Sequence, residues 1–295
     1  MFNVKEVKKM VKTNKKNILL SAVMLSAVFM FNCANQNSEE NLNQETDNVI
    51  SGVVSKGPVS NSVVTAYKLN TDASRGDLLG STTTAADGSY SLSTQYDGAV
   101  EIVATGGSYS DEATGIQVTL QAGYEMKTYM ASVTKQTKAA VTALTTIAAA
   151  HAYANAGANL STAISNANNQ VATQFGLSGA DITKDQPTDL TVNQGLANGY
   201  TYSHAEKYGA VLAAFSQYAE TTMVSETQVP LLIQNMAEDF SDGSFDGLKN
   251  GSALTNSITL QTQTCAANMN TYMYNFMNSP ENNSGLGDTD LGITP

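Results

Sequence analysis

Short runs of alternating apolar and polar residues dominate the chain between residues 49 and 133. Residues 49–54 and 63–69 are rich in valine and isoleucine, which favour strands, and turn residues separate such runs. The pair Asp87-Gly88 stands between two further runs, which predicts a β-hairpin at this point. Strands of this length and spacing are typical of an antiparallel β-sandwich or a small barrel, and we expect the sandwich.

The apolar spacing changes to a helical period of about 3.6 residues from about Thr137 onwards. Ser203 and Glu206 have the spacing of a capping box, and Ser225 and Gln228 form a second one. The apolar stripes predict five helices that close a bundle, so we expect an α+β fold with the sandwich first and the bundle second. The stripes contain Leu144, Ile147, Ala148, His151; Ile164, Ala167, Val171, Phe175; Tyr208, Val211, Leu212, Phe215, Ala219; Val229, Ile233, Met236, Phe240; and Leu254, Ile258, Cys265, Met269, Tyr272, Phe276.

The first 32 residues have the pattern of an export signal. Six lysines precede an apolar run of 14 residues, 18–31, which is too short to span a bilayer core of about 30 Å. Cys33 follows this run, and residues 34–48 are polar enough to form a flexible tether. We therefore expect a signal peptide over 1–32 and a lipidated N-terminus with a tether over 33–48. Met10 is an alternative start, and an ordinary signal peptide or an uncut anchor is the alternative reading of the leader.

The sequence Met30-Phe31-Asn32-Cys33 resembles the relaxed lipobox of spirochaete lipoproteins, although it lacks the usual leucine and the usual glycine or alanine. The resemblance implies cleavage before Cys33 and attachment of fatty acyl chains such as palmitate to the new N-terminus. The mature chain then carries nine basic and 25 acidic residues, a net charge of −16. The residues after Cys33 are uncharged, which by resemblance to lipoprotein sorting favours the outer membrane.

The strand region resembles a known fold family. The turns at Gly57-Pro58 and Asp87-Gly88, with the runs 63–69, 80–84 and 89–92, are similar to the carboxypeptidase regulatory-like (transthyretin-like) β-sandwich. The resemblance implies a non-catalytic spacer, scaffold or binding module over residues 49–133. We expect a helical domain over 134–278 and a disordered tail over 279–295.

Chemistry-bearing residues are scarce. The chain of 295 residues has two histidines, two cysteines and no tryptophan, and its net charge of −11 argues against nucleic acid as a partner. Asp111 and Glu112 could work as an acid–base pair, but two acids in a connecting loop more often form a solvated turn. We therefore expect a protein that is not an enzyme.

One segment has a calcium-like spacing of oxygen-bearing residues. Positions one, three, five, seven and nine of a calcium loop correspond to Asp242, Ser244, Asp246, Leu248 and Asn250, with Gly247 at the sharp turn. Ala253 stands where a bidentate glutamate should complete the shell, so any calcium binding would be of low affinity. The alternative is a turn between helices, and we expect no other cofactor.

These patterns favour a non-enzymatic lipoprotein of the cell envelope, held to the outer membrane by its lipid, with a binding or structural role. Its partners would be the membrane and proteins of the envelope or cell surface. One alternative is a surface adhesin that binds host or extracellular-matrix proteins. Another is a periplasmic ligand-binding protein or hydrolase with a site between the two parts, to which the loop 176–200 could contribute.

Overall fold

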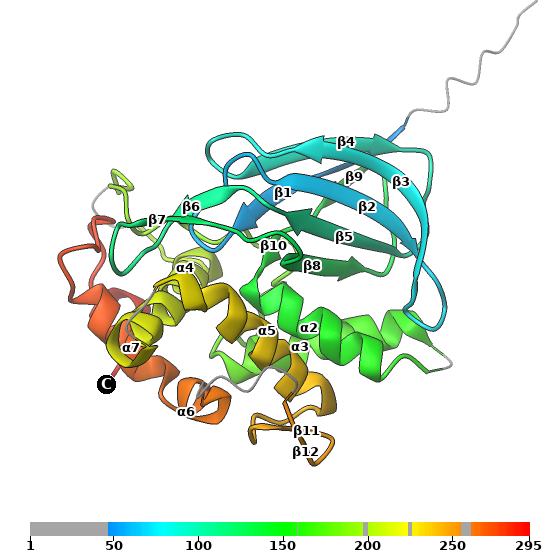
Figure 1. Ribbon diagram of the computed structural model, residues 1–295. Coiled ribbons are helices and arrows are strands. Elements are labelled where there is room, and N and C mark those ends of the chain that lie inside the picture. The colour runs from blue at the N-terminus through cyan, green and yellow to red at the C-terminus, as the bar shows by residue number, and fades with distance from the viewer. Residues whose placement is uncertain (1–46, 158, 197–199, 224–225, 255–260) are drawn as a thin grey trace, which may run out of the picture. The chain divides into compact units, whose positions relative to one another are not determined.

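The computed structural model describes residues 47–157, 159–196, 200–223, 226–254 and 261–295. Strands occupy the first part of these residues and helices the second, so the predicted α+β order is confirmed. Figure 1 shows the strands in two stacked layers with the helices packed below the second layer. Three layers therefore make up this body.

The strands form two main sheets. In the first, β1 (Asn48–Ser55) is antiparallel to β4 (Ser89–Thr94) and parallel to β9 (Gln136–Lys138) and β10 (Val141–Thr142). The second sheet is fully antiparallel, in the order β3 (Arg75–Thr83), β2 (Val63–Leu69), β5 (Val100–Thr105), β8 (Glu125–Met130). Two short hairpins complete the strands: β6 (Ser108–Ser110) with β7 (Gln117–Thr119), and β11 (Leu248–Lys249) with β12 (Ser252–Ala253).

The two sheets enclose one apolar core, as the period-two pattern predicts. Along β1 the buried Ile50 and Val54 alternate with partly exposed residues, because successive side chains of a strand point to opposite faces. They share a cluster with Val64, Ile102 and Met126 of the second sheet, all fully buried. The sandwich-like arrangement is thus fixed by the inward-facing residues of both sheets.

The Asp87-Gly88 turn does not join a hairpin, and this expectation was wrong. Strand β3 pairs with β2 and strand β4 pairs with β1, so the turn takes the chain from one sheet to the other. Buried Thr84 holds this corner, since its hydroxyl donates to Val59 O at 2.7 Å and accepts from the backbone N–H of Ser62 at 2.8 Å. Long-range pairing overrides the local turn signal here.

Six α-helices are described: α2 (Ala143–Ala154), α3 (Leu160–Gln174), α4 (His204–Tyr218), α5 (Val229–Asp239), α6 (Thr262–Ala267) and α7 (Met269–Met277). The Ser203–Glu206 capping box is confirmed at the start of α4. The predicted last helix is divided into α6 and α7 at Asn268. Ser225 and Ile258 of the predicted pattern lie outside the described residues, and Gln228 caps α5 without a side-chain hydrogen bond.

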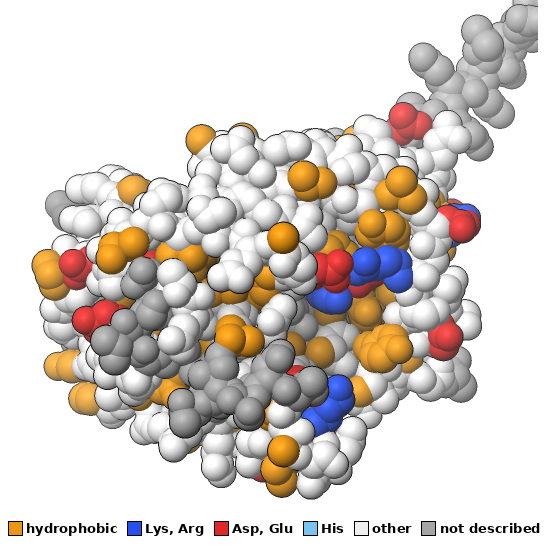
Figure 2. Space-filling view, viewed as in Figure 1, with side chains coloured by type: hydrophobic (Ala, Val, Ile, Leu, Met, Phe, Trp, Pro, Cys, Tyr) orange, Lys and Arg blue, Asp and Glu red, His pale blue; other side chains and the backbone are white. Residues whose placement is uncertain are grey.

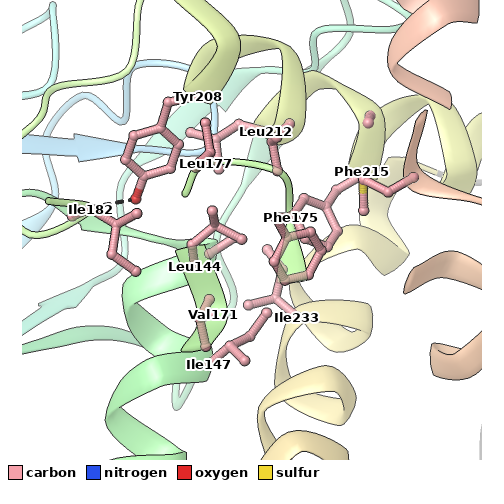
Figure 3. Close-up of a cluster of buried hydrophobic side chains, with 14 of the residues drawn as sticks. Leu144, Ile147, Val171, Phe175, Leu177, Ile182, Tyr208, Leu212, Phe215 and Ile233 are labelled. Atoms are coloured by element: carbon pink, nitrogen blue, oxygen red, sulfur yellow. Dashed lines mark hydrogen bonds between the residues drawn. The ribbon is translucent and has the colours of Figure 1, made fainter. Parts of the chain in front are cut away.

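Four helices converge on one apolar core (Figure 3). Leu144 of α2, Phe175 at the end of α3, Phe215 of α4 and Ile233 of α5 are each at most 2% exposed. The Phe175 and Phe215 rings lie 5.7 Å apart in a tilted arrangement, a favourable aromatic geometry. Helix α2 packs against both α3 and α5, and α4 packs against α7.

The strand and helix regions are not separated at residue 133, where we expected a boundary. Strands β9 and β10 follow that position and pair with β1. Thr142, the last residue of β10, forms a capping box with Thr145 and so starts α2 directly from the sheet. Helix α2 also contacts β8, where the backbone N–H of Lys127 donates to the Thr146 hydroxyl at 3.0 Å. The sheet therefore extends beyond the expected boundary, and α2 is built onto it.

The irregular segment 176–200 is packed into the helical core over its described part. Leu177, Ile182 and Leu190 are at most 2% exposed, and Tyr208 of α4 donates its hydroxyl to Ile182 O at 3.2 Å (Figure 3). A Cβ on Gly209 would lie 2.1 Å from the carbonyl oxygen of residue 188, so only glycine permits this approach. The segment is a structural connector between α3 and α4 that packs against α4 without forming a helix of its own.

The C-terminal residues 279–295 are ordered, in contrast to the expected disordered tail. A short 3-10 turn, η4 (Thr289–Leu291), presents Leu291 to the interior. Leu286, Leu291 and Ile293 are 5%, 9% and 3% exposed and belong to the helical core. Burial of these three apolar side chains fixes the polar tail on the helical core.

Candidate functional site

A cleft of about 680 Å³ lies between the second sheet and the helices α2 and α5. Figure 2 shows basic and acidic side chains beside hydrophobic ones on this face of the molecule, between the sheet and the helices. The volume is in the range of small-molecule sites, about 300–1,000 Å³. The lining comprises Ala73, Arg75, Glu101, Gly123, Glu125, Lys127, Tyr129, Thr146, Ala149, Ala150, Tyr153, Ala154, Gln234, Ala237, Glu238, Ser241, Lys249 and Asn250.

The sheet side of the cleft is a network of four charged residues, here called the cleft cluster: Arg75, Glu101, Glu125 and Lys127. The Arg75 guanidinium donates to Glu101 at 2.5 and 3.1 Å and to Glu125 at 3.2 and 2.9 Å. Lys127 lies 3.2 Å from a Glu125 oxygen and 3.6 Å from a Glu101 oxygen. Each carboxylate thus has two cationic partners.

Strand alternation gathers these side chains. Glu101 of β5 faces Tyr129 of β8, and Lys127 faces Val103, so their side chains lie on the face of the sheet that meets the helices. Arg75, the only arginine in the chain, begins β3 and reaches them across β2, with its guanidinium carbon 4.7 Å from the Tyr67 ring centroid. Our reading of the sequence did not single out this site, although charged residues at alternate strand positions were its visible signal.

The ion pairs of the cleft cluster favour the charged forms of Arg75 and Glu125. Hydrogen bonds to Glu101 and Glu125 raise the pKa of the Arg75 guanidinium above its ordinary value. Burial raises the pKa of Glu125, but hydrogen bonds from Arg75 and Lys127 outweigh it, so that the pKa of this carboxyl lies below its ordinary value. The Glu101 side chain is 3% exposed, against 36% for Arg75, so the cluster spans the floor and the mouth of the cleft.

Alanines on α2 create the hollow. Ala149, Ala150 and Ala154 present only methyl groups to the cleft, which leaves space between the helix and the sheet. Tyr153 of the same helix is 57% exposed, whereas Tyr129 of β8 is 7% exposed. Large apolar groups and small ones therefore lie next to the charges.

The helix side supplies a second ion pair. Lys249 of the β11–β12 hairpin lies 3.4 Å from a carboxylate oxygen of Glu238 on α5. With the cleft cluster this gives three cations and three carboxylates in the lining. The two aliphatic hydroxyls of the lining, on Thr146 and Ser241, each donate to a backbone carbonyl at 2.7 Å. This arrangement can bind a ligand by exchanging ion-pair partners, and its two aliphatic hydroxyl groups already donate to the backbone.

The calcium-like segment forms the loop beside this cleft. Asp242 accepts from the Ser244 backbone and hydroxyl at 3.2 and 2.9 Å and from the Asn250 N–H at 2.8 Å, and Asp246 accepts from the Leu248 N–H at 2.9 Å. The hydrogen bond from Asn250 is the largest cause of a lowered Asp242 pKa. Within the part of the chain that the structure describes, no three histidine, cysteine or acidic residues gather as a metal site. A cation would therefore compete with the loop's own N–H donors.

Asp111 and Glu112 are not solvated, and the expectation of a surface turn was wrong. They are 0% and 5% exposed, and they meet Lys56 and Ser216 in a second group of polar side chains. Lys56 directly precedes the predicted Gly57-Pro58 turn, and Ser216 lies in a predicted helix 160 residues later. Nothing in the sequence pattern brings such distant residues together.

The expected lipidation site Cys33, the signal peptide over 1–32 and most of the tether lie outside the described residues. No helix among residues 47–157, 159–196, 200–223, 226–254 and 261–295 has the length and apolarity needed to cross a membrane. Lipidation of Cys33 stays a prediction from the sequence.

Comparisons with known proteins add little to this geometry. No family model matches the chain, and no curated protein matches it. Among solved structures, a 9R-lipoxygenase from Cyanothece PCC8801 is 11% identical, with a TM-score of 0.24, and the match covers 70% of this chain. The chain corresponds to 26% of that protein, and a likeness at this level carries no argument about fold or activity.

Proposed function

We propose that the chain is a non-enzymatic lipoprotein of the cell envelope, anchored through Cys33, whose folded body binds a small ligand in the cleft. The observation that carries this proposal is a hollow of about 680 Å³ that combines an apolar wall on α2 with paired charges of both signs. Binding sites commonly have this composition, in which apolar walls supply affinity and a few polar groups supply orientation. The leader sequence supports the anchor.

The charges of the cleft suggest the chemistry of the ligand. Three cations and three carboxylates line it, so it suits a molecule that carries both charge signs better than a simple anion or cation. Tyr153 and the alanines of α2 offer contact area for an apolar or aromatic group. A short peptide has these features together, and we propose it as the ligand class.

The cleft also bears on the alternatives. It lies between strands and helices, which favours the ligand-binding alternative over the adhesin, although residues 176–200 do not line it. The engaged hydroxyls of Thr146 and Ser241 favour binding over hydrolysis. We further propose that the sandwich is of the carboxypeptidase regulatory-like type, acting as a scaffold, and that the lipid holds the body at the outer membrane.

A blocking substitution tests the cleft. Ala150→Trp places a large ring at a half-buried cleft position, and Ala86→Trp places the same ring on an exposed turn far from it. We expect a library of charged tripeptides to contain peptides that bind the unmodified chain and the Ala86→Trp variant with equal affinity in calorimetric titration. Ala150→Trp should weaken that binding at least tenfold, about 1.4 kcal/mol. Equal affinity in both variants would remove the cleft from the proposal.

Labelling and proteolysis test the anchor and the location separately. Growth with an alkynyl palmitate analogue should label the chain but not its Cys33→Ala variant. Added protease should digest the body on intact cells if it faces outward, and only after permeabilisation if it faces the periplasm. Digestion on intact cells would restore the adhesin as the leading alternative, and absence of label would contradict the anchor.

A further inference from the structure

Four buried polar side chains form a second group, here called the sealed cluster: Lys56, Asp111, Glu112 and Ser216. Lys56 follows β1, the two acids follow β6, and Ser216 lies on α4; the β6–β7 hairpin is drawn above α4 in Figure 1. Their exposed fractions are 1%, 0%, 5% and 1%. The Lys56 Nζ atom lies 2.6 Å from a Glu112 oxygen and 2.8 Å from Ser216 Oγ.

The hydrogens of the sealed cluster can be counted. Ser216 Oγ lies 2.6 Å from an Asp111 oxygen and 2.8 Å from a Glu112 oxygen, but its hydroxyl has one hydrogen and can donate to only one of them. Asp111 also accepts from the N–H groups of Ala113 and Thr114 and from the Thr114 hydroxyl, at 3.1–3.2 Å, so donors already surround its carboxylate oxygens and a hydrogen of its own would meet no acceptor. Glu112 is therefore the carboxyl that carries a hydrogen.

This assignment also balances the buried charge. With Asp111 ionised, Glu112 neutral and Lys56 protonated, the cluster has no net charge, whereas a second carboxylate would leave one buried negative charge uncompensated. Burial raises the pKa of Glu112, and the charge of Asp111 raises it further against the opposing effect of Lys56. The ammonium of Lys56 and the neutral carboxyl of Glu112 are thus held in direct contact.

The cluster has no room for an outside substrate. The cavity beside it, lined by Gly57, Glu112 and Gly209 among others, has a volume of about 10 Å³, which can hold at most one water molecule. The Tyr109 ring covers the lysine, with its centroid 5.6 Å from Nζ. Any reaction here must take place between the members of the cluster themselves.

We propose that Lys56 and Glu112 condense to form an intramolecular amide bond, so that this is a self-modification site. The Lys56 ammonium passes one proton through the Ser216 hydroxyl to the Asp111 carboxylate, and the freed amine attacks Cδ of Glu112. The C–N bond forms, the C–OH bond of Glu112 breaks, and the hydroxyl leaves with an amine proton as one water molecule. Asp111 keeps the proton that it received, so atoms and charge balance without any oxidant or co-reactant.

Two physical effects favour this step. Fixed contact between amine and carboxyl replaces a bimolecular encounter, and such arrangements reach very high effective concentrations. The product is also neutral, which removes the cost of keeping a lysine and a carboxylate charged in the interior. The bond would tie the end of β1 to the loop after β6, 56 residues later, and so add a covalent link to the β6–β7 hairpin beyond the Ser60–Ser108 bridge.

Mass spectrometry of the purified full chain tests the proposal. After tryptic digestion we expect the peptides that contain Lys56 and Glu112 to appear joined, at their summed mass less one water. The exposed pair Lys68–Asp77, 3.1 Å apart, is the internal control and should stay unlinked in the same digest. Separate Lys56 and Glu112 peptides at full mass in the unmodified sequence would overturn the proposal, and this reading needs no variant to fold.

A matched variant assigns the bond. Lys56→Arg keeps the positive charge but replaces the amine, so the water loss should vanish and the two peptides should separate. Glu112→Gln should give the same linked product as the unmodified chain, because an amide loses ammonia where an acid loses water. Water loss that persists in Lys56→Arg would mean that another pair reacts, and would also overturn the proposal.

Discussion

The cleft cluster and the sealed cluster use the same residue types in two different surroundings. Arg75 and Lys127 of the cleft cluster are 36% and 27% exposed, whereas Lys56 of the sealed cluster is 1% exposed. Water reaches Arg75, Lys127 and Glu125 of the first cluster, so their ion pairs can exchange with a ligand. No such exchange exists in the second, where each group depends on its neighbours. Access of solvent, rather than residue type, separates a binding surface from a fixed internal contact.

The largest expected difference between the clusters follows from removing one cation from each. Lys56→Met leaves the sealed acids without their cation, or without their amide link, and should lower the free energy of unfolding by about 3–5 kcal/mol. Lys127→Met removes a partly exposed partner and should cost about 0–1 kcal/mol. Urea denaturation of both variants measures this, and equal losses would contradict the distinction.

The hydroxyl at the centre of the sealed cluster should matter next. Ser216→Ala removes a group that contacts Lys56, Asp111 and Glu112 without adding bulk. Leaving buried polar groups unsatisfied should cost about 1–3 kcal/mol. The matched change Ser93→Ala on the exposed face of β4 should be nearly neutral in the same thermal unfolding experiment. A neutral Ser216→Ala would mean that the cluster does not depend on this hydroxyl.

The two clusters should respond to pH in opposite directions. The pKa of Glu125 is lower in the folded chain than in the unfolded one, so its contribution to stability is present above the unfolded pKa, about 4.3, and is lost as the pH falls. Glu125→Gln should remove this acid-side loss in a pH series of melting temperatures. An unchanged acid slope would contradict the assignment.

The pH dependence of the sealed cluster can be measured in a Lys56→Arg chain, in which the amide cannot form and Glu112 stays titratable. Burial raises the Glu112 pKa in the folded state, so its contribution is present below the unfolded pKa and is lost as the pH rises through the raised value. Glu112→Gln in this background should flatten that loss. If the contribution of Glu112 to stability changed with pH in the same direction as that of Glu125, the predicted opposite response of the two clusters would be wrong.

The smallest expected effect on stability is that of Arg75→Lys. Lysine keeps the charge but cannot make two forked contacts, so we expect a loss of less than about 1 kcal/mol. The same variant should weaken peptide binding in the cleft. The control variant Lys68→Met, which removes the exposed Lys68–Asp77 pair, should leave the peptide affinity nearly unchanged. Unchanged peptide affinity with lost stability would make the cluster structural only.

Features encoded within a few residues could be predicted. The Ser203–Glu206 capping box was visible in the sequence because both partners lie in one helical turn. The buried faces of β1 and β2 followed from period-two alternation, since a strand with one buried face must repeat every second residue. The Asp87-Gly88 turn was also located, but its neighbours pair with other strands.

The amino-acid sequence by itself determined the order of strands and helices, most helix positions and the pattern that predicts an exported, lipid-anchored chain. Only the tertiary structure decided that Asp111 and Glu112 are buried against Lys56 and Ser216, that Arg75 bridges two glutamates at a cleft, and that residues 279–295 complete the core. The physical reason is the distance along the chain over which each interaction acts. Backbone propensity and side-chain alternation act between near neighbours, whereas desolvation of a charge depends on which distant surfaces close over it.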